Sequence, residues 1–156
     1  MCGGGGGGAG CGTLELGCGF AALAYAPFFV KLGVAMLTQG PVKYNNVMPR
    51  ETKWEEVMSD HLDRAKFIER CSAAHANGLE ALLGFSSAML LAKVNGVPDS
   101  AVKPLGNTFL GLRVLYNLAY LGGVNTPVAY IRTACFLTGQ YVQLHIFALA
   151  AVSKKA

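Results

Sequence analysis

The chain has 156 residues, of which 53% are hydrophobic and only 14% are charged, and its net charge is +4. An ordinary soluble domain carries about 25% charged residues, so this composition, with a mean hydropathy of +0.39, argues against a soluble globular protein. The sequence has no basic cluster interleaved with aromatic residues, so nucleic acid is not the expected partner.

The first segment of the chain, residues 1–13, consists mainly of glycine. Gly3, Gly5 and Gly8 formally fit the pattern GxGxxG, but no strand precedes them, so the match indicates no dinucleotide site. We expect residues 1–13 to form a flexible tail and residues 14–153 to form one domain.

Four long apolar segments follow, each with a single charged residue: 17–37, 71–92, 104–124 and 127–152. A helix needs about 20 residues to cross a bilayer, and each segment is long enough. Backbone groups in lipid must be satisfied within the segment, which favours helices. The sequence therefore predicts an all-α, transmembrane four-helix bundle. The alternative is a soluble bundle with unusually apolar helices.

The connections give little information about orientation. The first connection contains five basic residues and the opposite side contains four, so the positive-inside rule barely favours a cytosolic first loop. We expect an integral, multi-pass protein of an endomembrane such as the endoplasmic reticulum. The five cysteines are widely spaced and form no metal-binding pattern, so no metal site is expected.

Polar residues in and just before the second apolar segment fall on one face of the predicted helix. At about 100° per residue, Arg70 and Asn77 nearly coincide, and Glu69 and Glu80 lie beside them. His75 points elsewhere and is expected to be a packing histidine. Ionisable residues at membrane depth are costly, and by default they indicate a functional site.

The third and fourth segments repeat this pattern. Arg113, Tyr116, Asn117 and Tyr120 share one arc of the third helix, and Arg132 begins a polar stripe on the fourth. Three arginines against one deeply placed glutamate leave positive charge that suits an anionic ligand. The alternative is a structural ion pair, in which Arg70 or Arg113 pairs with Glu80 and sets the helix register.

The segment ERCSAAHANGLEALLGF (69–85) resembles the signature of the MAPEG family, the membrane-associated proteins in eicosanoid and glutathione metabolism. The matching residues are Glu69, Arg70, Ala74, His75, Asn77 and Glu80. RVLYNLAY resembles the family's third-helix element, and YIRTACFLTG resembles the element that opens the fourth helix. YNNVMPRE (44–51) is a looser match to an element of the first loop.

The resemblance implies a homotrimer in the lipid bilayer, with glutathione as co-substrate between subunits and a lipophilic small-molecule substrate. It places the glutathione-binding residues at Arg70, Asn77, Glu80, Arg113, Tyr116, Tyr120 and Arg132. Arginines would pair with the glutathione carboxylates, Glu80 with its amine and Asn77 with its peptide groups. Arg132 is the candidate catalytic residue that stabilises the thiolate, helped by Tyr120 or Tyr116.

Two functions follow from the resemblance. The first is a membrane-bound glutathione transferase or peroxidase that acts on lipophilic electrophiles or lipid hydroperoxides. The second is a non-catalytic, lipid-binding or scaffolding member, because Ala73 and Ala76 stand where other members can carry arginines that face glutathione. A structural membrane protein with inert ion pairs is a third alternative.

Overall fold

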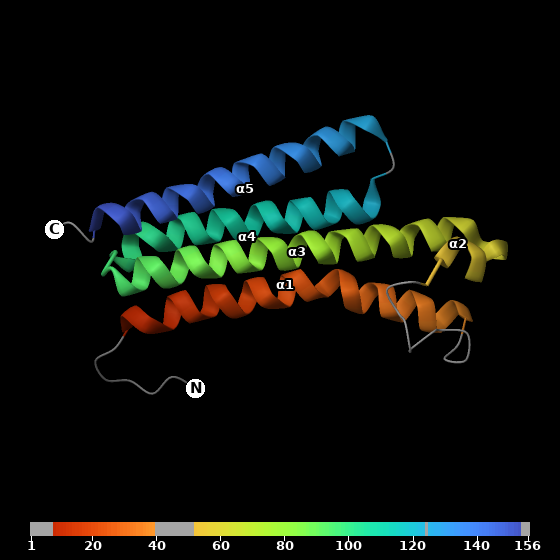
Figure 1. The fold of residues 1–156 in the computed structure, drawn as a ribbon, viewed down its shortest axis with the longest axis horizontal. Coiled ribbons are helices and arrows are strands. Elements are labelled where there is room, and N and C mark those ends of the chain that lie inside the picture. Colours follow the sequence, from red (N-terminus) through yellow and green to blue (C-terminus); the bar gives the residue numbers. More distant parts are fainter. Residues whose placement is uncertain (1–7, 40–51, 124, 154–156) are drawn as a thin grey trace.

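The computed structural model describes residues 8–39, 52–123 and 125–153, and these residues form four main helices and two short ones (Figure 1). The main helices are α1 (Gly8–Gln39), α3 (Leu62–Val94), α4 (Asp99–Gly122) and α5 (Thr126–Ser153). The short elements, α2 (Trp54–Val57) and the 3-10 helix η1 (Ser59–His61), precede α3. The predicted all-α, four-helix architecture is therefore confirmed.

Each main helix contains most of one predicted apolar segment, and α3 begins nine residues before its segment (62 against 71). The reason is that arginine, lysine and glutamate, which stand at positions 64, 66, 69 and 70, favour helix about as strongly as leucine does. The prediction followed hydropathy instead. Helix α1 begins at Gly8, inside the range 1–13 expected to be a tail. The remainder of that tail, residues 1–7, and the first-loop segment 44–51 lie outside the described residues.

The helices run lengthwise beside one another in an up-and-down bundle (Figure 1). Helix α1 packs mainly on α3, and α4 packs mainly on α5, while α3 contacts all three of the others. Helices α3 and α4 are joined by a tight turn in which Gly96 has a φ of 72°, the left-handed region that favours glycine. Asn95 in this turn donates a hydrogen bond to the carbonyl oxygen of Ala150 (2.8 Å), which ties the turn to α5.

Three phenylalanines from three helices form the centre of the core. The rings of Phe85 on α3 and Phe109 on α4 are stacked, with centroids 4.3 Å apart. Phe20 on α1 meets both rings edge-on, at 5.4 and 5.1 Å. A separate cluster beside α2 contains Trp54 and Ile68, and Lys31 Nζ lies 5.5 Å from the centroid of the Trp54 ring.

Much of the apolar surface of the bundle is exposed, for example Leu37 (90%), Leu83 (74%) and Tyr130 (72%). By length and composition, two segments within the described residues qualify as membrane spans: Glu15–Thr38 in α1 and Thr126–Ser153 in α5. In the most apolar 18-residue stretch of each span, only 22% (α1) and 28% (α5) of the residues are buried. The core helix of a soluble protein would be mostly buried. Helices α3 and α4 are long enough to cross a membrane, at 33 and 24 residues, but neither contains an 18-residue stretch as apolar as those in α1 and α5.

Helix α1 bends at its middle (Figure 1), where Pro27 lies buried inside the helix. A proline lacks the N–H that would donate to the carbonyl four residues earlier, here that of Leu23. Asn117 Nδ2 on α4 donates to this oxygen instead, at 3.2 Å. His75 Nδ1 on α3 lies 2.9 Å from the next carbonyl oxygen, that of Ala24, and must carry the proton because that oxygen only accepts.

We call Pro27, His75 and Asn117 the α1 clasp, because side chains from two helices satisfy backbone groups at the bend. The prediction that His75 is a packing histidine is confirmed, since its ring also lies against Tyr25 and Phe28. Gly78, one turn along α3 from His75, lets α1 approach closely. A Cβ at Gly78 would come within 3.1 Å of the Ala24 Cα atom.

Candidate functional site

Arg113 is a buried arginine without a counter-charge. Its side chain is 3% exposed, and its Nε, Nη1 and Nη2 atoms are buried without a hydrogen-bond partner. Its guanidinium lies between aromatic rings, with Cζ 5.3 Å from the centroids of Phe109 and Tyr116 and 6.0 Å from that of Phe136. Cation–π contacts offset part of the cost of burial, but the five N–H donors of a guanidinium remain available.

Tyr116, Tyr120 and Arg132 lie on the same side of the bundle as Arg113. The Tyr116 and Tyr120 rings are 5.5 Å apart on successive turns of α4, which faces α5. Arg132, in the second turn of α5, places Cζ 4.3 Å from the centroid of the Tyr120 ring. Tyr116 also interacts electrostatically with Arg113, Arg132 and Glu80, so helices α3, α4 and α5 all contribute. We call these five residues, Glu80, Arg113, Tyr116, Tyr120 and Arg132, the Arg113 group.

Glu80 lies at the edge of the group and is exposed, whereas Arg113 is buried inside the bundle. Within the described part of the chain, neither Arg70 nor Arg113 forms an ion pair with Glu80. The alternative of a structural ion pair with Glu80 is therefore wrong for both arginines, and the positive charge of Arg113 is not neutralised by an acid. The group thus extends from the interior to the surface of the chain.

Two other predicted ligands lie along α3. Asn77 is half-buried and uses Nδ2 to donate to the carbonyl oxygen of Ala73 (3.0 Å), which leaves its Oδ1 to accept. Arg70 lies two turns before Asn77, and its guanidinium Cζ lies 5.7 Å from the centroid of the Phe67 ring. Arg70 faces a cavity between α1 and α3, and none of its described contacts is with Arg113, Tyr116, Tyr120 or Arg132.

Sequence reasoning did not assign a role to several residues that hold this site in place. The rings of Phe109 and Phe136 lie near the Arg113 guanidinium, and nothing in the sequence distinguishes these phenylalanines from the others in the apolar helices. Gln143 on α5 packs so tightly on Gly84 of α3 that a Cβ at Gly84 would come within 2.5 Å of its side chain. Asn117 had a usable signal, since Pro27 within a helix predicts a carbonyl that needs an outside donor.

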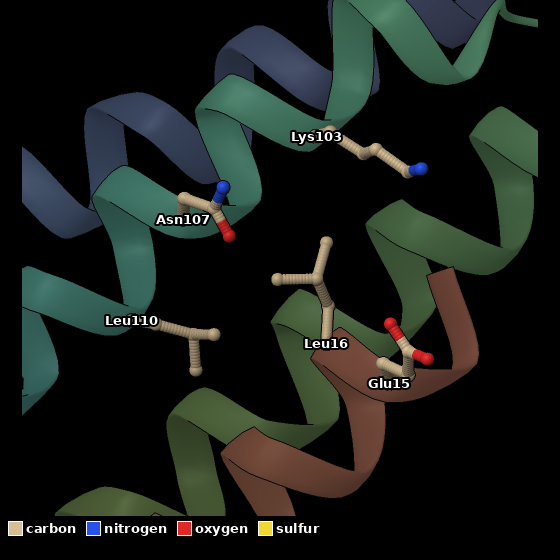
Figure 2. A pocket seen from close by; sticks show the side chains of 5 residues that line it. All are labelled: Glu15, Leu16, Lys103, Asn107 and Leu110. Atoms are coloured by element: carbon tan, nitrogen blue, oxygen red, sulfur yellow. The ribbon is translucent and has the colours of Figure 1, made fainter. Parts of the chain in front are cut away.

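A cavity of about 310 Å³ opens at the opposite end of the bundle, between the start of α1 and the start of α4 (Figure 2). Its lining residues are Glu15, Leu16, Lys103, Asn107 and Leu110. Leu16 points from α1 toward α4, and its Cδ1 would lie 2.8 Å from a Cβ at Gly106. None of the predicted site residues lines this cavity, so it is separate from the Arg113 group.

The described residues contain no group of three or more His, Cys, Asp or Glu side chains arranged to hold a metal ion. The side chains of the Arg113 group supply two guanidiniums, two phenols and one carboxylate. Such a set binds anions and stabilises negative charge that develops on a bound molecule.

The sequence pattern of the MAPEG family matches residues 16–152, which include most of α1 and α5, all of α3 and α4, and every predicted site residue. The chain belongs to the MAPEG family. No curated protein and no solved structure matches it. The family fold is a transmembrane four-helix bundle, so the exposed apolar surface of this MAPEG protein faces lipid or other membrane-embedded protein.

Family membership also gives the broad class of function. The MAPEG family consists of integral membrane proteins and includes glutathione transferases and proteins of eicosanoid metabolism. Many members are glutathione-dependent enzymes. In this MAPEG protein, four of the seven predicted ligands form a chain of contacts that runs from Arg113 through Tyr116 and Tyr120 to Arg132. Glu80 lies near enough to Tyr116 to act on it electrostatically.

Proposed function

We propose that this MAPEG protein is a glutathione transferase or peroxidase of an endomembrane, acting on lipophilic electrophiles or lipid hydroperoxides. The observation that carries the proposal is Arg113, whose three guanidinium nitrogens are buried without partners. A buried, unpaired charge is costly, and a bound anion would remove that cost. The anion would also reach Arg132, which interacts with the same tyrosines.

The charges of the group match those of glutathione. Arg113, Arg132 and Glu80 together carry a net charge of +1, and glutathione, with two carboxylates and one amine, carries −1. The arginines would pair with carboxylates, in bidentate fashion where the geometry permits, and Glu80 would accept from the amine. Asn77 would accept from a peptide N–H through its free Oδ1. Whether Arg70 also binds glutathione stays a prediction.

Arg132 and Tyr120 are the proposed catalytic residues. The guanidinium of Arg132, 4.3 Å from the Tyr120 ring, would stabilise the glutathione thiolate, and the Tyr120 hydroxyl would donate a hydrogen bond to the sulfur. In the transferase reaction, the thiolate attacks an electrophilic carbon and a C–S bond forms as the leaving group departs. In the peroxidase reaction, the thiolate attacks the terminal oxygen of the hydroperoxide, an S–O bond forms, the O–O bond breaks, and the alkoxide takes up a proton and leaves as the alcohol. A second glutathione thiol then attacks the resulting sulfenic acid, which forms glutathione disulfide and releases water.

A neighbouring subunit would complete the site. Glu80 is exposed in the single chain, and Tyr120 and Arg132 are partly exposed. We propose a homotrimer in which the adjacent subunit covers this opening, so that glutathione binds at the interface and the lipophilic substrate enters from the bilayer.

The test is a thiolate titration of the purified protein in detergent. Glutathione should produce ultraviolet thiolate absorbance and conjugation of a model electrophile. Arg132→Leu should abolish the absorbance and lower kcat by about 100-fold, the typical loss of one charge-stabilising donor. Lys103→Gln, which removes an exposed positive charge at the other end of the bundle, serves as the matched control and should change neither. A well-folded protein without any glutathione binding would overturn the proposal.

The second candidate is a non-catalytic, lipid-binding member of the family. Residues 73 and 76 are both alanine, so neither position supplies the positive charge that glutathione-binding members can carry there. In that case the wild-type protein would show no conjugation, and Arg132→Ala would leave both lipid binding and cellular phenotype intact. Conjugation that is lost in Arg132→Ala would favour the enzyme instead.

A further inference from the structure

A cavity of about 570 Å³ lies between the last turns of α1 and the first turns of α3. Its apolar lining residues are Val34 and Leu37 of α1 and Phe67 of α3. Leu37 is 90% exposed, so the cavity is continuous with the outer surface of the bundle. In a membrane protein, such a surface contacts acyl chains.

The polar lining residues of the cavity are Thr38 of α1 and Asp63, Arg64 and Arg70 of α3. Arg64 Nη1 donates a long hydrogen bond to Thr38 Oγ1 (3.4 Å), and the Thr38 hydroxyl itself donates to the carbonyl oxygen of Val34. The Nε atom of Arg70 is buried without a hydrogen-bond partner. The Arg64 guanidinium therefore makes only a weak hydrogen bond, and the Arg70 guanidinium has an N–H donor that is not used.

The cavity lies at one end of the bundle, where α1 ends at Gln39 and α3 begins at Leu62. In a bundle that crosses a membrane, the helix ends lie near the lipid headgroups, so Arg64, in the first turn of α3, would lie at headgroup depth. Arg70 lies less than two turns further along α3, and its long side chain would reach the same depth. Basic pockets between transmembrane helices at this depth bind anionic headgroups.

We propose that this cavity binds an anionic glycerophospholipid, with its phosphate group between Arg64 and Arg70 and an acyl chain against Leu37 and Phe67. Guanidinium groups match the geometry of phosphate oxygens. Among the described lining residues, two arginines and one aspartate give a net charge of +1, which complements a lipid with a single negative charge. The proposal assigns Arg70 to lipid and does not depend on glutathione binding.

The experiment is native mass spectrometry of the delipidated protein in detergent, titrated with phosphatidylglycerol and, separately, with phosphatidylcholine. Phosphatidylglycerol should bind more tightly. Arg64→Gln and Arg70→Gln should each weaken its binding about fivefold, the effect of one basic residue at a membrane surface. Asp63→Asn should strengthen binding by a similar factor, because it removes the opposing charge. Arg64 and Asp63 are exposed, so these two variants should fold normally.

The matched control is Lys103→Gln, which removes the same charge at the other end of the bundle and should leave phosphatidylglycerol binding unchanged. Equal affinity for the two lipids, or an equal loss in Lys103→Gln, would overturn the proposal. Displacement by inorganic phosphate as readily as by short-chain phosphatidylglycerol would also overturn it, since the site would then be one for soluble phosphate. Thiolate absorbance of Arg64→Gln with glutathione should equal that of wild type, so the two proposed sites fail independently.

Discussion

Arg113 shows how much a single residue can indicate about a ligand. An arginine in an apolar helix is expected to find an acid or to reach the interface, and Arg113 does neither. It instead lies among Phe109, Tyr116 and Phe136, with its hydrogen-bond donors unused. Among the described residues, the ligand-free chain therefore contains no acid that compensates this charge, and a bound anion would do so.

Replacing Arg113 separates its cost to stability from its use in binding. We expect Arg113→Met to raise the stability of the ligand-free protein by about 1 kcal/mol, because it removes a buried, unpaired charge and fills the same space. The same variant should lose all stabilisation by glutathione. Thermal unfolding in detergent, with and without glutathione, measures both effects.

The control for this prediction is Arg113→Lys, which keeps the charge and should retain part of the glutathione effect. A variant Arg113→Met that is strongly destabilised yet still binds glutathione would show that the arginine is structural. The anion-site interpretation would then be wrong.

At the scale of secondary-structure elements, the α1 clasp links the first helix to the helices that carry the site. Asn117 lies one residue after Tyr116 and donates to Leu23 on α1. His75 lies two residues before Asn77 and contacts Ala24 on α1. The rotation of α3 and α4 that directs Glu80, Asn77 and Tyr116 is thus fixed by contacts at the bend.

The clasp predicts a coupled effect of two substitutions. Asn117→Ala should destabilise the protein by about 1–3 kcal/mol, because the carbonyl oxygen of Leu23 becomes a buried acceptor without a donor. In a Pro27→Ala background, the same change should cost much less, since the N–H of the new residue 27 donates to Leu23. A double-mutant cycle of unfolding free energies measures the coupling.

Asn107→Ala is the control for the clasp, because Asn107 lies on the exposed side of α4 and lines the small cavity (Figure 2). It should cost little in either background. If Asn117→Ala costs the same with and without Pro27, then the bend does not depend on Asn117.

At the scale of the whole molecule, exposed apolar side chains and a half-open polar site both indicate partners outside the single chain. Most residues of the apolar spans in α1 and α5 are not buried within the chain. Lipid covers such surfaces, but lipid would not satisfy Glu80 at the edge of the site. A second copy of the chain would satisfy both.

Oligomeric state and glutathione binding should therefore change together. Native mass spectrometry in mild detergent should show trimers that bind glutathione, and harsher detergent that releases monomers should abolish the binding. Monomers that bind glutathione as tightly as trimers would contradict a site between subunits.

The sequence by itself determined the helical class, the number of main helices and their approximate positions. It did so because hydropathy, segment length and the need to satisfy backbone groups in lipid are local properties of the chain. It also predicted that Arg113, Tyr116 and Tyr120 lie on one face of α4, since helical periodicity is a local property too.

Only the tertiary structure decided which residues meet across helices. The partner of Asn117 is 94 positions away along the chain, and the distance of Arg132 from Tyr120 depends on how α5 turns back after α4. Likewise, Arg70 shares a sequence stripe with Asn77 but faces a cavity against α1. Periodicity specifies the face of a helix, whereas packing between helices selects what that face contacts.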